Sequence, residues 1–381
     1  MRNLIVGLGK SGLAAAALLL KKQQEVVGYD EQKKGAPFPT MSTISFEGID
    51  RIVLSPGVDP RRPFLDSARA LGIPIIGETE LGLQEVGGTV IGITGTNGKT
   101  TTSLLLAHFL RQNGKTAELL GNIGKPLCQY LVHKGEQKGS DRVIILELSS
   151  FQLETAETKA LFCAAITNVS PNHLDRYDSY AEYQNAKWRI RSLLLHEEHF
   201  VVGSSLSELF PRAIDGGSSS ASIARAIAKL LGCEATSLEG FQTPEHRLEY
   251  LSTWRGISFY NDSKSTSPAS TIYAVQKIQK PILLICGGSE KNLDYTLWKT
   301  AFKGMVKTVI TMGPCGKKMA RAVKRDYLTY EKSSLKEAFF FALSLAKSGE
   351  AILLSPGSAS FDAFKNFEER GTHFKELVRH L

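Results

Sequence analysis

The chain contains 381 residues, of which 42% are hydrophobic and 22% are charged, and its formal net charge is +8. This composition excludes a disordered or fibrous protein, and the length favours three domains over one. Lys and Arg residues are spread along the whole sequence without a recognisable nucleic-acid-binding motif. We therefore expect anionic small-molecule substrates and no nucleic-acid partner.

The cysteines and the N-terminal residues predict a cytoplasmic protein. The five cysteines include no CxxC pair, and an odd number excludes a complete set of intramolecular disulfides, as is typical of a reducing compartment. The apolar start of the chain is similar to a signal peptide, but Lys10 and a glycine-rich turn interrupt it, so we expect a strand followed by a helix. No other stretch reaches the roughly 18 unbroken apolar residues of a membrane span, so we expect no membrane association.

Alternating strands and helices predict an α/β fold with three domains, each built on its own sheet. In residues 1–87 the apolar runs LIVGLG, EVVGYD, RIVLSPGV and IPIIGE predict parallel strands separated by helices. Residues 88–243 begin with a strand, a glycine turn and a helix in TVIGITGTNGKTTTSLLLAHFL, and continue through VIILELSS and AAITNVS. In residues 244–381 we interpret GISFYNDS, PILLICGG, TVITMG and AILLSPGS as further strands.

The segment ITGTNGKTT predicts a phosphate-binding loop. A buried strand ends in the turn, and Lys99 and Thr100 begin the next helix, so backbone N–H groups and the helix N-terminus can bind anionic oxygens. Lys99 can neutralise terminal phosphates, and the Thr100 hydroxyl can ligate magnesium. The loop is shorter than G-x-x-x-x-G-K-[ST], because Ile93 stands at the place of the first glycine, while Gly95 and Gly98 supply the turn.

The opening GLGKSG is similar to a dinucleotide-binding fingerprint. Gly7, Gly9 and Gly12 have the G-x-G-x-x-G spacing, and Asp30 ends the next strand about 20 residues on. Alone, these residues leave open an oxidoreductase with a nicotinamide cofactor, and together with the phosphate-binding loop they also leave open a regulatory nucleotide-binding protein that catalyses no reaction. The second phosphate loop favours an enzyme with two nucleotide-containing substrates.

Three ionisable residues follow the phosphate-binding loop in the second domain. They are Glu147 at the end of VIILE, His173 in NVSPNHLDRY and Lys187 in YQNAKWRI. Separately, each has an ordinary interpretation, as a helix cap, a turn residue or a solvated lysine. We predict a catalytic role because all three lie beyond strand carboxyl ends beside a phosphate loop, where α/β proteins form their sites.

Two charged segments begin the third domain. EHRLE at 245–249 places His246 and Arg247 at the domain junction, and YNDSKST places Asp262, Lys264 and Thr266 just after a strand. These groups either bind a phosphate when domains close or form ordinary surface salt bridges.

Motifs distributed over nearly the whole chain resemble those of the Mur ligase family. They are GLGKSG, SPGV, ITGTNGKTT, GNIG, LELSSFQLE, NHLDRY, AKWRI, EHR, NDSKST, ICGGSEK and SPGSASFDAFKNFEERG. The resemblance implies an N-terminal Rossmann-like UDP-binding domain, a central P-loop ATPase domain and a C-terminal Rossmann-like domain. It also implies an ATP-dependent ligase that adds D-glutamate to UDP-N-acetylmuramoyl-L-alanine through an acyl phosphate in peptidoglycan synthesis. Another Mur-family or a folylpolyglutamate-type ligase is the alternative.

The resemblance further implies roles for single residues of a monomer that binds ATP and two magnesium ions. The catalytic residues would be Lys99, Glu147, His173 and Lys187. The metal ligands would be Thr100, Glu147, His173 and Lys187, the last as a carbamate. The ATP contacts would be Gly95, Thr96, Asn97, Gly98, Lys99, Thr100, Thr101, Arg247 and Asp262. The UDP-substrate contacts would be Gly9, Lys10, Ser11, Asp30, Gly57 and Asn122. The D-glutamate contacts would be Lys264, Thr266, Lys291, Ser360 and Phe367.

Overall fold

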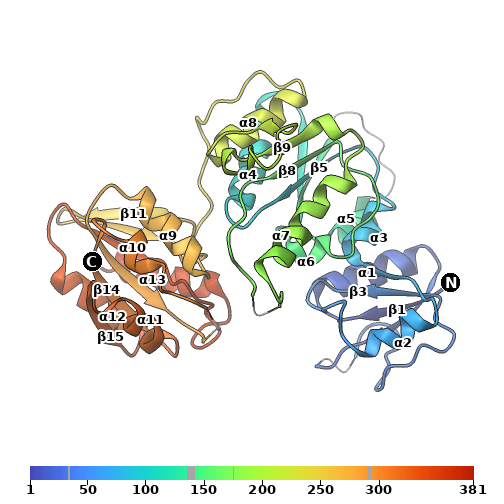
Figure 1. The fold of residues 1–381 in the computed structure, drawn as a ribbon, viewed down its shortest axis with the longest axis horizontal. Coiled ribbons are helices and arrows are strands. Elements are labelled where there is room, and N and C mark those ends of the chain that lie inside the picture. The colour runs from blue at the N-terminus through green and yellow to red at the C-terminus, as the bar shows by residue number, and fades with distance from the viewer. Residues whose placement is uncertain (33–34, 135–141, 175, 291–292) are drawn as a thin grey trace. The chain divides into compact units, whose positions relative to one another are not determined.

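The computed structural model describes residues 1–32, 35–134, 142–174, 176–290 and 293–381 (Figure 1). The chain divides into two compact units. The first consists of Met1–Ser170 and Arg176–Phe241, and the second of Gln242–Leu381 with the short segment that starts at Pro171. The described residues form three sheets, of which the first two belong to the first unit. The boundaries 1–87, 88–243 and 244–381 stay predictions.

The first sheet has the strand order β2-β1-β3-β4, and its strand pairs are parallel. Its elements are β1 (Arg2–Val6), α1 (Lys10–Lys21), β2 (Glu25–Tyr29), β3 (Arg51–Leu54), α2 (Phe64–Ala70), β4 (Ile75–Gly77) and α3 (Glu78–Leu83). The central strand β1 is buried on both faces, because Ile5 packs with residues of α1 and Leu4 with residues of α2. This is the continuous apolar pattern that predicts a parallel strand between helices.

The second sheet has the order β10-β9-β8-β5-β7-β6, again with parallel pairs. Its strands are β5 (Thr89–Thr94), β6 (Thr116–Gly121), β7 (Arg142–Glu147), β8 (Cys163–Ile166), β9 (Phe200–Val202) and β10 (Ile214–Asp215). Its helices are α4 (Lys99–Gln112), α5 (Leu127–Lys134), α6 (Ser150–Leu153), α7 (Tyr180–Trp188) and α8 (Ser220–Leu230), with 3-10 turns at Arg189–Leu193, Glu197–His199 and Ser204–Leu206. Ile144 and Ile145 of β7 belong to the cores on opposite faces. Burying each such side chain contributes about 1.5–3 kcal/mol.

The third sheet has the order β11-β12-β16-β13-β14-β15. Its strands are β11 (Glu249–Trp254), β12 (Ile257–Asn261), β13 (Ile282–Gly287), β14 (Val306–Met312), β15 (Leu328–Lys332) and β16 (Ala351–Leu354). Its helices are α9 (Pro268–Lys277), α10 (Trp298–Ala301), α11 (Gly316–Val323), α12 (Leu335–Leu345) and α13 (Phe367–Arg379). The edge strand β11 pairs antiparallel with β12, whereas the other pairs are parallel. The sequence patterns do not predict β11, because its residues are only partly buried or exposed.

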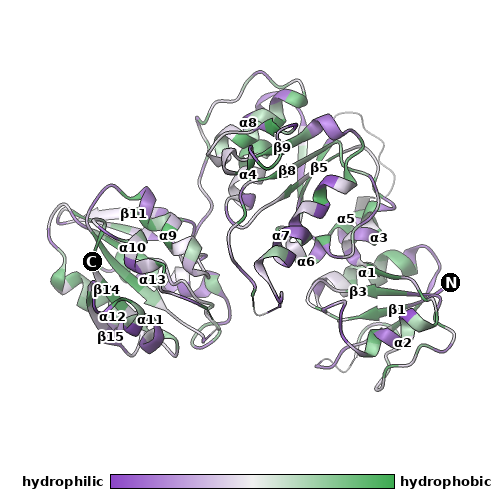
Figure 2. Cartoon of the chain, viewed as in Figure 1, coloured by the Kyte–Doolittle hydropathy of each residue, from purple (hydrophilic) through white to green (hydrophobic). Residues whose placement is uncertain are grey.

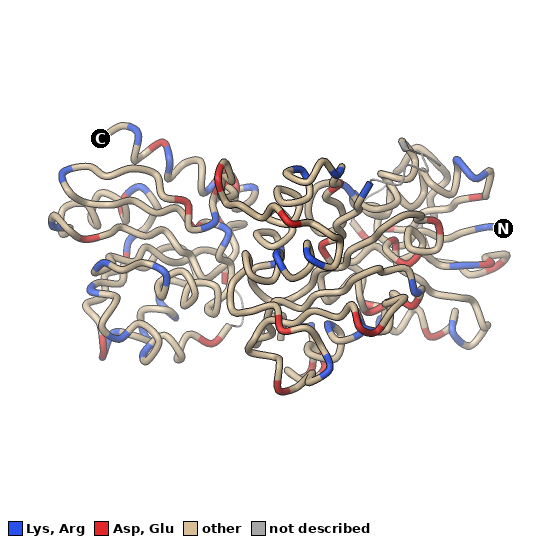
Figure 3. The backbone as a smooth tube through the Cα atoms, turned by 90° about the horizontal axis from the view of Figure 1, so that it is seen from above, with Lys and Arg blue, Asp and Glu red and all other residues tan. Residues whose placement is uncertain are grey.

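Hydropathy and charge follow this arrangement. The strands are mostly hydrophobic and the outer helix surfaces are mixed (Figure 2). Lys and Arg residues occur along the whole backbone, interspersed with Asp and Glu (Figure 3). In the part of the chain that the structure describes, no helix combines the length and the apolar character needed to cross a membrane. These three sheets, parallel except for the β11–β12 pair and covered by helices, confirm the predicted α/β fold class.

Candidate active site

The loop between β5 and α4 has the backbone of a phosphate-binding turn. Gly95 and Gly98 adopt positive φ angles of 144° and 84°. A Cβ atom at Gly95 would lie 1.9 Å from Thr167 Oγ1, so both conformation and space require glycine there. α4 begins at Lys99, directly after this turn. The N-terminal N–H groups of a helix carry partial positive charge, so the turn can bind phosphate oxygens.

Residues after β8 hold this loop in place. Thr167 Oγ1 donates to the carbonyl oxygen of Asn97 over 2.5 Å, and Asn168 Nδ2 donates to the same oxygen over 3.0 Å. The backbone N–H of Asn97 donates in turn to Asn168 Oδ1 over 3.1 Å. Thr167 and Asn168 were not among the predicted site residues. Their signal is two polar residues directly after the buried run CAAI, on the strand that pairs with β5.

The Lys99 side chain folds back over the loop that precedes it. Its Nζ donates to the carbonyl oxygens of Gly95 over 2.6 Å and Thr96 over 2.9 Å. The positive charge therefore lies inside the turn, where a phosphate group would meet it.

Glu147, the last residue of β7, contacts two other predicted site residues, Thr100 and Asn122. Its side chain is only 1% exposed. Thr100 Oγ1 donates to one carboxylate oxygen over 2.6 Å, and Asn122 Nδ2 donates to the other over 2.7 Å. The structure thus brings the phosphate loop, the end of β7 and the GNIG segment together.

Lys187 of α7 lies beside this cluster and is 2% exposed. Burial lowers the pKa of Lys187 well below its usual value, the positive charge of Lys99 lowers it further, and the carboxylate of Glu147 opposes the shift. Its Nζ lies 4.9 Å from the centre of the Tyr183 ring, and the Tyr183 hydroxyl is 3.0 Å from Thr96 Oγ1. Tyr183 was not among the predicted site residues, although its position one helical turn before Lys187 places both on one helix face.

His173 adopts a positive φ angle of 56°, which is uncommon for a residue other than glycine. Its backbone N–H donates to Asn172 Oδ1 over 3.0 Å. His173 belongs to the short segment that groups with the second compact unit. Its place beside Glu147 and Lys187 therefore stays a prediction.

The GLGKSG turn of the first sheet is braced by its neighbours. Gly7 has a φ of 87°, and a Cβ at Gly12 would lie 1.9 Å from the Gly7 carbonyl oxygen. Ser55 Oγ donates to that oxygen over 2.7 Å, and the backbone N–H of Leu8 donates to Asp30 Oδ2 over 2.6 Å. Asp30 thus fixes the turn that precedes α1, which gives it a structural role beside the predicted substrate contact.

Lys10 connects this turn to the second sheet. Its Nζ donates to the carbonyl oxygen of Gly124 over 2.8 Å, two residues after Asn122. Ser11 is partly buried at the start of α1, and Gly57 is exposed after β3. The predicted UDP-substrate contacts therefore lie at one edge of the first sheet and in the loop after β6.

The carboxyl ends of three strands meet in the third sheet, since Leu354 of β16 pairs with Asn261 of β12 and with Ile285 of β13. Asp262 follows β12 and is buried. It accepts hydrogen bonds from the Leu248 backbone N–H over 3.0 Å and from Ser355 Oγ over 2.8 Å. Burial raises the pKa of Asp262 to about 6, although these bonds and the charge of Arg247 act in the opposite direction.

The predicted D-glutamate contacts that the structure describes follow strands of the third sheet or begin its helix α13. Lys264 Nζ is 3.7 Å from the centre of the Phe367 ring, which begins α13. Ser360 is buried, and Thr266 is partly buried just before α9. Lys291 lies outside the described residues.

Arg370 joins two of these segments and was not among the predicted site residues. Its guanidinium is buried and donates to Ser263 Oγ over 3.0 Å, and to the carbonyl oxygens of Ser263, Ser358 and Ala359 over 2.9, 3.1 and 3.1 Å. These bonds join the segment after β12 to the segment that contains Ser360. The signal in the sequence is the arginine of NFEERG, one helical turn after Phe367.

Successive α/β sheets, with a phosphate loop beside a buried carboxylate and a second glycine turn nearby, define a multidomain nucleotide-binding protein. The sequence matches the Mur ligase MurD-like N-terminal domain over residues 1–77, the Mur ligase middle domain over residues 93–211 and the Mur ligase glutamate ligase domain over residues 246–357. The chain belongs to the Mur ligase family.

Two relatives are similar over their full length. The UDP-N-acetylmuramoylalanine--D-glutamate ligase of Protochlamydia amoebophila is 33% identical over 439 residues, with 100% of this chain and 98% of the relative covered. The enzyme of the same name from Chlamydia caviae is 34% identical over 419 residues, with 99% and 97% covered.

Among solved structures, MurF ligase from Thermotoga maritima in complex with ADP has a TM-score of 0.62 at 14% identity, and 100% of this chain and 95% of that chain are covered. A pseudomurein peptide ligase type C from Methanothermus fervidus has a TM-score of 0.60 at 15% identity, with 100% and 99% covered. The family matches and these similarities confirm the predicted three-domain α/β fold.

Proposed function

We propose that this chain is an ATP-dependent amide ligase that adds D-glutamate to UDP-N-acetylmuramoyl-L-alanine in peptidoglycan precursor synthesis. The observation that carries the proposal is the connection of two anion-binding turns within one compact unit. Lys10 of the GLGKSG turn donates to Gly124, and nearby Asn122 donates to Glu147 beside the phosphate loop. A nucleotide-linked substrate and ATP can therefore bind next to each other, and the names of the relatives supply the two amide partners.

The chemistry requires an activated carboxylate. Transfer of the ATP γ-phosphoryl group to the L-alanine carboxylate gives an acyl phosphate, which the amine of D-glutamate attacks with release of phosphate. Lys99 and the N–H groups of the loop would hold the transferring phosphoryl group and offset its charge. This positioning is the main contribution that the protein makes.

The oxygen donors at this site suit magnesium, which prefers carboxylate, hydroxyl and water ligands. In the described residues no group of three or more His, Cys, Asp or Glu side chains is assembled for a metal, so other oxygens must complete the ligand set. We propose that Thr100 and Glu147 hold one ion and that His173 and Lys187 hold a second. Magnesium, when bound, would neutralise phosphate charge and polarise the phosphoryl oxygen.

Lys187 suits this ligand set only after modification. An ammonium group would repel a cation, whereas a carbamate, formed when carbon dioxide adds to the neutral amine, supplies anionic oxygens. The lowered pKa of Lys187 makes the neutral amine available. We therefore include a carbamylated Lys187 in the proposal.

The third sheet would supply the D-glutamate site. Lys264 and Lys291 carry positive charges for carboxylate groups, and Thr266, Ser360 and Phe367 would fix the orientation of the amino acid. Arg247 and Asp262 would contact ATP. The enzyme would act as a cytoplasmic monomer, and these assignments stay proposals.

Phosphate release from ATP tests the proposal. The purified chain should release phosphate only when UDP-N-acetylmuramoyl-L-alanine and D-glutamate are both present. L-Glutamate and meso-diaminopimelate should fail to replace D-glutamate, and a folate with L-glutamate should give no turnover. Equal turnover with either replacement amino acid, or with the folate pair, would contradict the assignment and favour the alternative ligases.

A further inference from the structure

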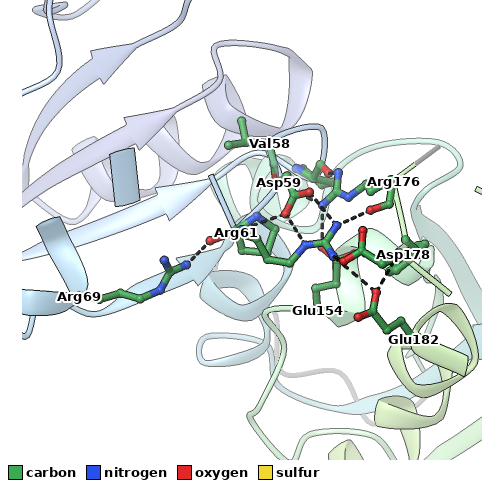
Figure 4. A network of polar contacts seen from close by, with 11 residues as sticks. Val58, Asp59, Arg61, Arg69, Glu154, Arg176, Asp178 and Glu182 are labelled. Carbon is green, nitrogen blue, oxygen red and sulfur yellow. Dashed lines mark hydrogen bonds and ion pairs between the residues drawn. The ribbon is translucent and has the colours of Figure 1, made fainter. Parts of the chain in front are cut away.

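Two arginines make reciprocal contacts between the loops of the first and second sheets (Figure 4). Arg61, which follows β3, donates to the main-chain carbonyl oxygen of Arg176. Arg176, which precedes α7, donates to the carbonyl oxygens of Pro56 over 3.1 Å and Val58 over 3.3 Å. Each arginine thus binds the backbone of the other sheet's loop. We call Arg61 and Arg176 the arginine clasp.

Arg176 makes the stronger half of the clasp. Its side chain is 12% exposed and pairs with Glu154, which is 14% exposed, over 2.6 Å. Its guanidinium carbon lies 4.0 Å from the centre of the Phe151 ring. Arg61, in contrast, is 46% exposed and pairs with Asp178, which is 85% exposed. Exposed ion pairs contribute little, whereas a buried charge-assisted bond is costly to break, so Arg176 dominates the contact.

The clasp connects two segments that adjoin the proposed nucleotide sites. On one side, Pro56 and Val58 flank Gly57 and follow Ser55, whose Oγ donates to Gly7 in the GLGKSG turn. On the other side, Phe151 belongs to α6, which begins three residues after Glu147 at the end of β7. Arg176 therefore links the segment that braces the UDP turn to the helix that follows the phosphate-site carboxylate.

We propose that Arg176 is a positioning residue that sets the distance between the UDP turn and the phosphate loop; this inference rests on the proposed function. One substrate must place its uridine diphosphate on the first sheet and its reacting carboxylate beside the γ-phosphate on the second. A shift of about 1 Å between reacting groups can lower a rate about a hundredfold. The planar guanidinium reaches Pro56, Val58 and Glu154 at once, which an ammonium group lacks the geometry to do.

The test compares Arg176→Ala and Arg176→Lys with the wild-type chain. Both variants should lower kcat about tenfold or more. The affinities for UDP and for ATP, each measured alone by calorimetry, should stay within about twofold, because each ligand binds mainly one sheet. Arg191→Ala is the matched control, since Arg191 forms an exposed ion pair with Glu197 after α7 and should leave kcat unchanged.

Glu154→Gln provides a second variant that keeps the size of the side chain and removes its charge. It should lower kcat in the same direction but less, and the double variant with Arg176→Ala should be no slower than Arg176→Ala alone, because both changes break one contact. If Arg176→Ala fails to fold, an unchanged kcat in Glu154→Gln overturns the inference.

Two further results would also overturn it while leaving the ligase assignment intact: an Arg176→Ala kcat within about twofold of wild type, or a loss of UDP affinity as large as the loss of kcat. An equal loss of UDP affinity would mean that Arg176 only holds the conformation of residues 56–58. A wild-type chain without ligase activity would refute the proposed function instead.

Discussion

Two buried ionisable residues, Lys187 and Asp262, have pKa values displaced toward their neutral forms. In both cases burial is the main cause, because a charged group loses hydration that its neighbours only partly replace. Buried ionisable residues with such shifts are costly for stability, and they concentrate at functional sites. The effect of substituting Lys187 on activity and the effect of substituting Asp262 on stability can be measured separately.

Substitution of Lys187 should abolish ligase activity without removing the phosphate loop. We expect Lys187→Ala to lower kcat about a hundredfold or more, since a ligand for the metal would be lost. Affinity for ATP in calorimetry should change little, because Lys99 and the loop remain. Acetate added to Lys187→Ala should restore part of the activity by supplying a carboxylate.

Lys229→Ala serves as the control for this experiment, because Lys229 is exposed on α8. Mass spectrometry under carbon dioxide should detect the added carboxylate on wild-type Lys187. Normal turnover of Lys187→Ala would exclude the carbamate.

Asp262 should make the stability of the protein fall as the pH rises. Its folded pKa of about 6 lies above the usual 3.8, so the folded state holds the proton more tightly than the unfolded state. The loss of folding stability that ionisation of Asp262 causes begins near pH 4. It is complete above pH 6, where it reaches about 3 kcal/mol. Asp262→Asn can still accept the Leu248 hydrogen bond but has no carboxyl group to ionise. The midpoint of its unfolding transition should therefore decline less between these pH values than that of the wild-type chain.

Asp294→Asn serves as a control, because the contribution of Asp294 to stability should depend on pH in the opposite direction. Hydrogen bonds from Thr296 lower the pKa of Asp294, so its stabilising contribution is present above pH 4 and is lost as the pH falls through the folded pKa. Parallel pH profiles for wild type and Asp262→Asn would contradict the predicted role of Asp262.

At the scale of elements, α13 is fixed to the third sheet through Arg370. Burial lowers the pKa of Arg370 to about 10, so the side chain stays charged at neutral pH. Its bonds go to the carbonyl oxygens of Ser358 and Ala359, which precede Ser360, and to Ser263, which precedes Lys264. Ser360 and Lys264 are proposed glutamate contacts. Arg370 of α13 thus holds the segments that follow β12 and β16 in place, although α13 lies far from β12 in the sequence.

We expect Arg370→Lys to raise the KM for D-glutamate about tenfold. The ammonium group keeps the positive charge, but it lacks the planar set of donors with which the guanidinium joins the segment at Ser263 to the segment at Ser358 and Ala359. Arg370→Met should also lower the free energy of unfolding by about 3 kcal/mol, since buried carbonyl groups lose their donors. Arg379→Ala, at the exposed end of the same helix, should change neither quantity. A KM for D-glutamate within about twofold in Arg370→Lys would show that the helix anchor does not position the substrate.

At the scale of the whole molecule, the net charge of +8 is distributed along the backbone (Figure 3). Interspersed acidic residues weaken the field of the Lys and Arg residues, and salt screens what remains. We expect any binding of duplex DNA in fluorescence anisotropy to disappear by about 150 mM salt. The KM for the UDP-linked substrate should rise less than about threefold over the same range, because the turns bind it through short-range contacts. DNA binding that persists at this salt concentration would contradict the expected absence of a nucleic-acid partner.

The sequence by itself determined the strands with continuous apolar runs, the glycine turns and the family, because these depend on local burial, on positive φ angles and on short motifs. β5, β7, β13 and β16 follow directly from such runs. The edge strand β11 did not, since its exposed residues leave no hydrophobic pattern.

The tertiary structure decided which side chains meet. Thr100 and Glu147 are 47 residues apart, and Arg176 contacts Pro56 over a separation of 120 residues. Periodicity reports the burial of a residue but not the identity of its partner, so the roles of Thr167, Asn168 and Arg370 emerged only from the fold. Parallel sheets bring the carboxyl ends of distant strands to one edge, and this geometry assembles the site from segments that carry no joint signal in the sequence.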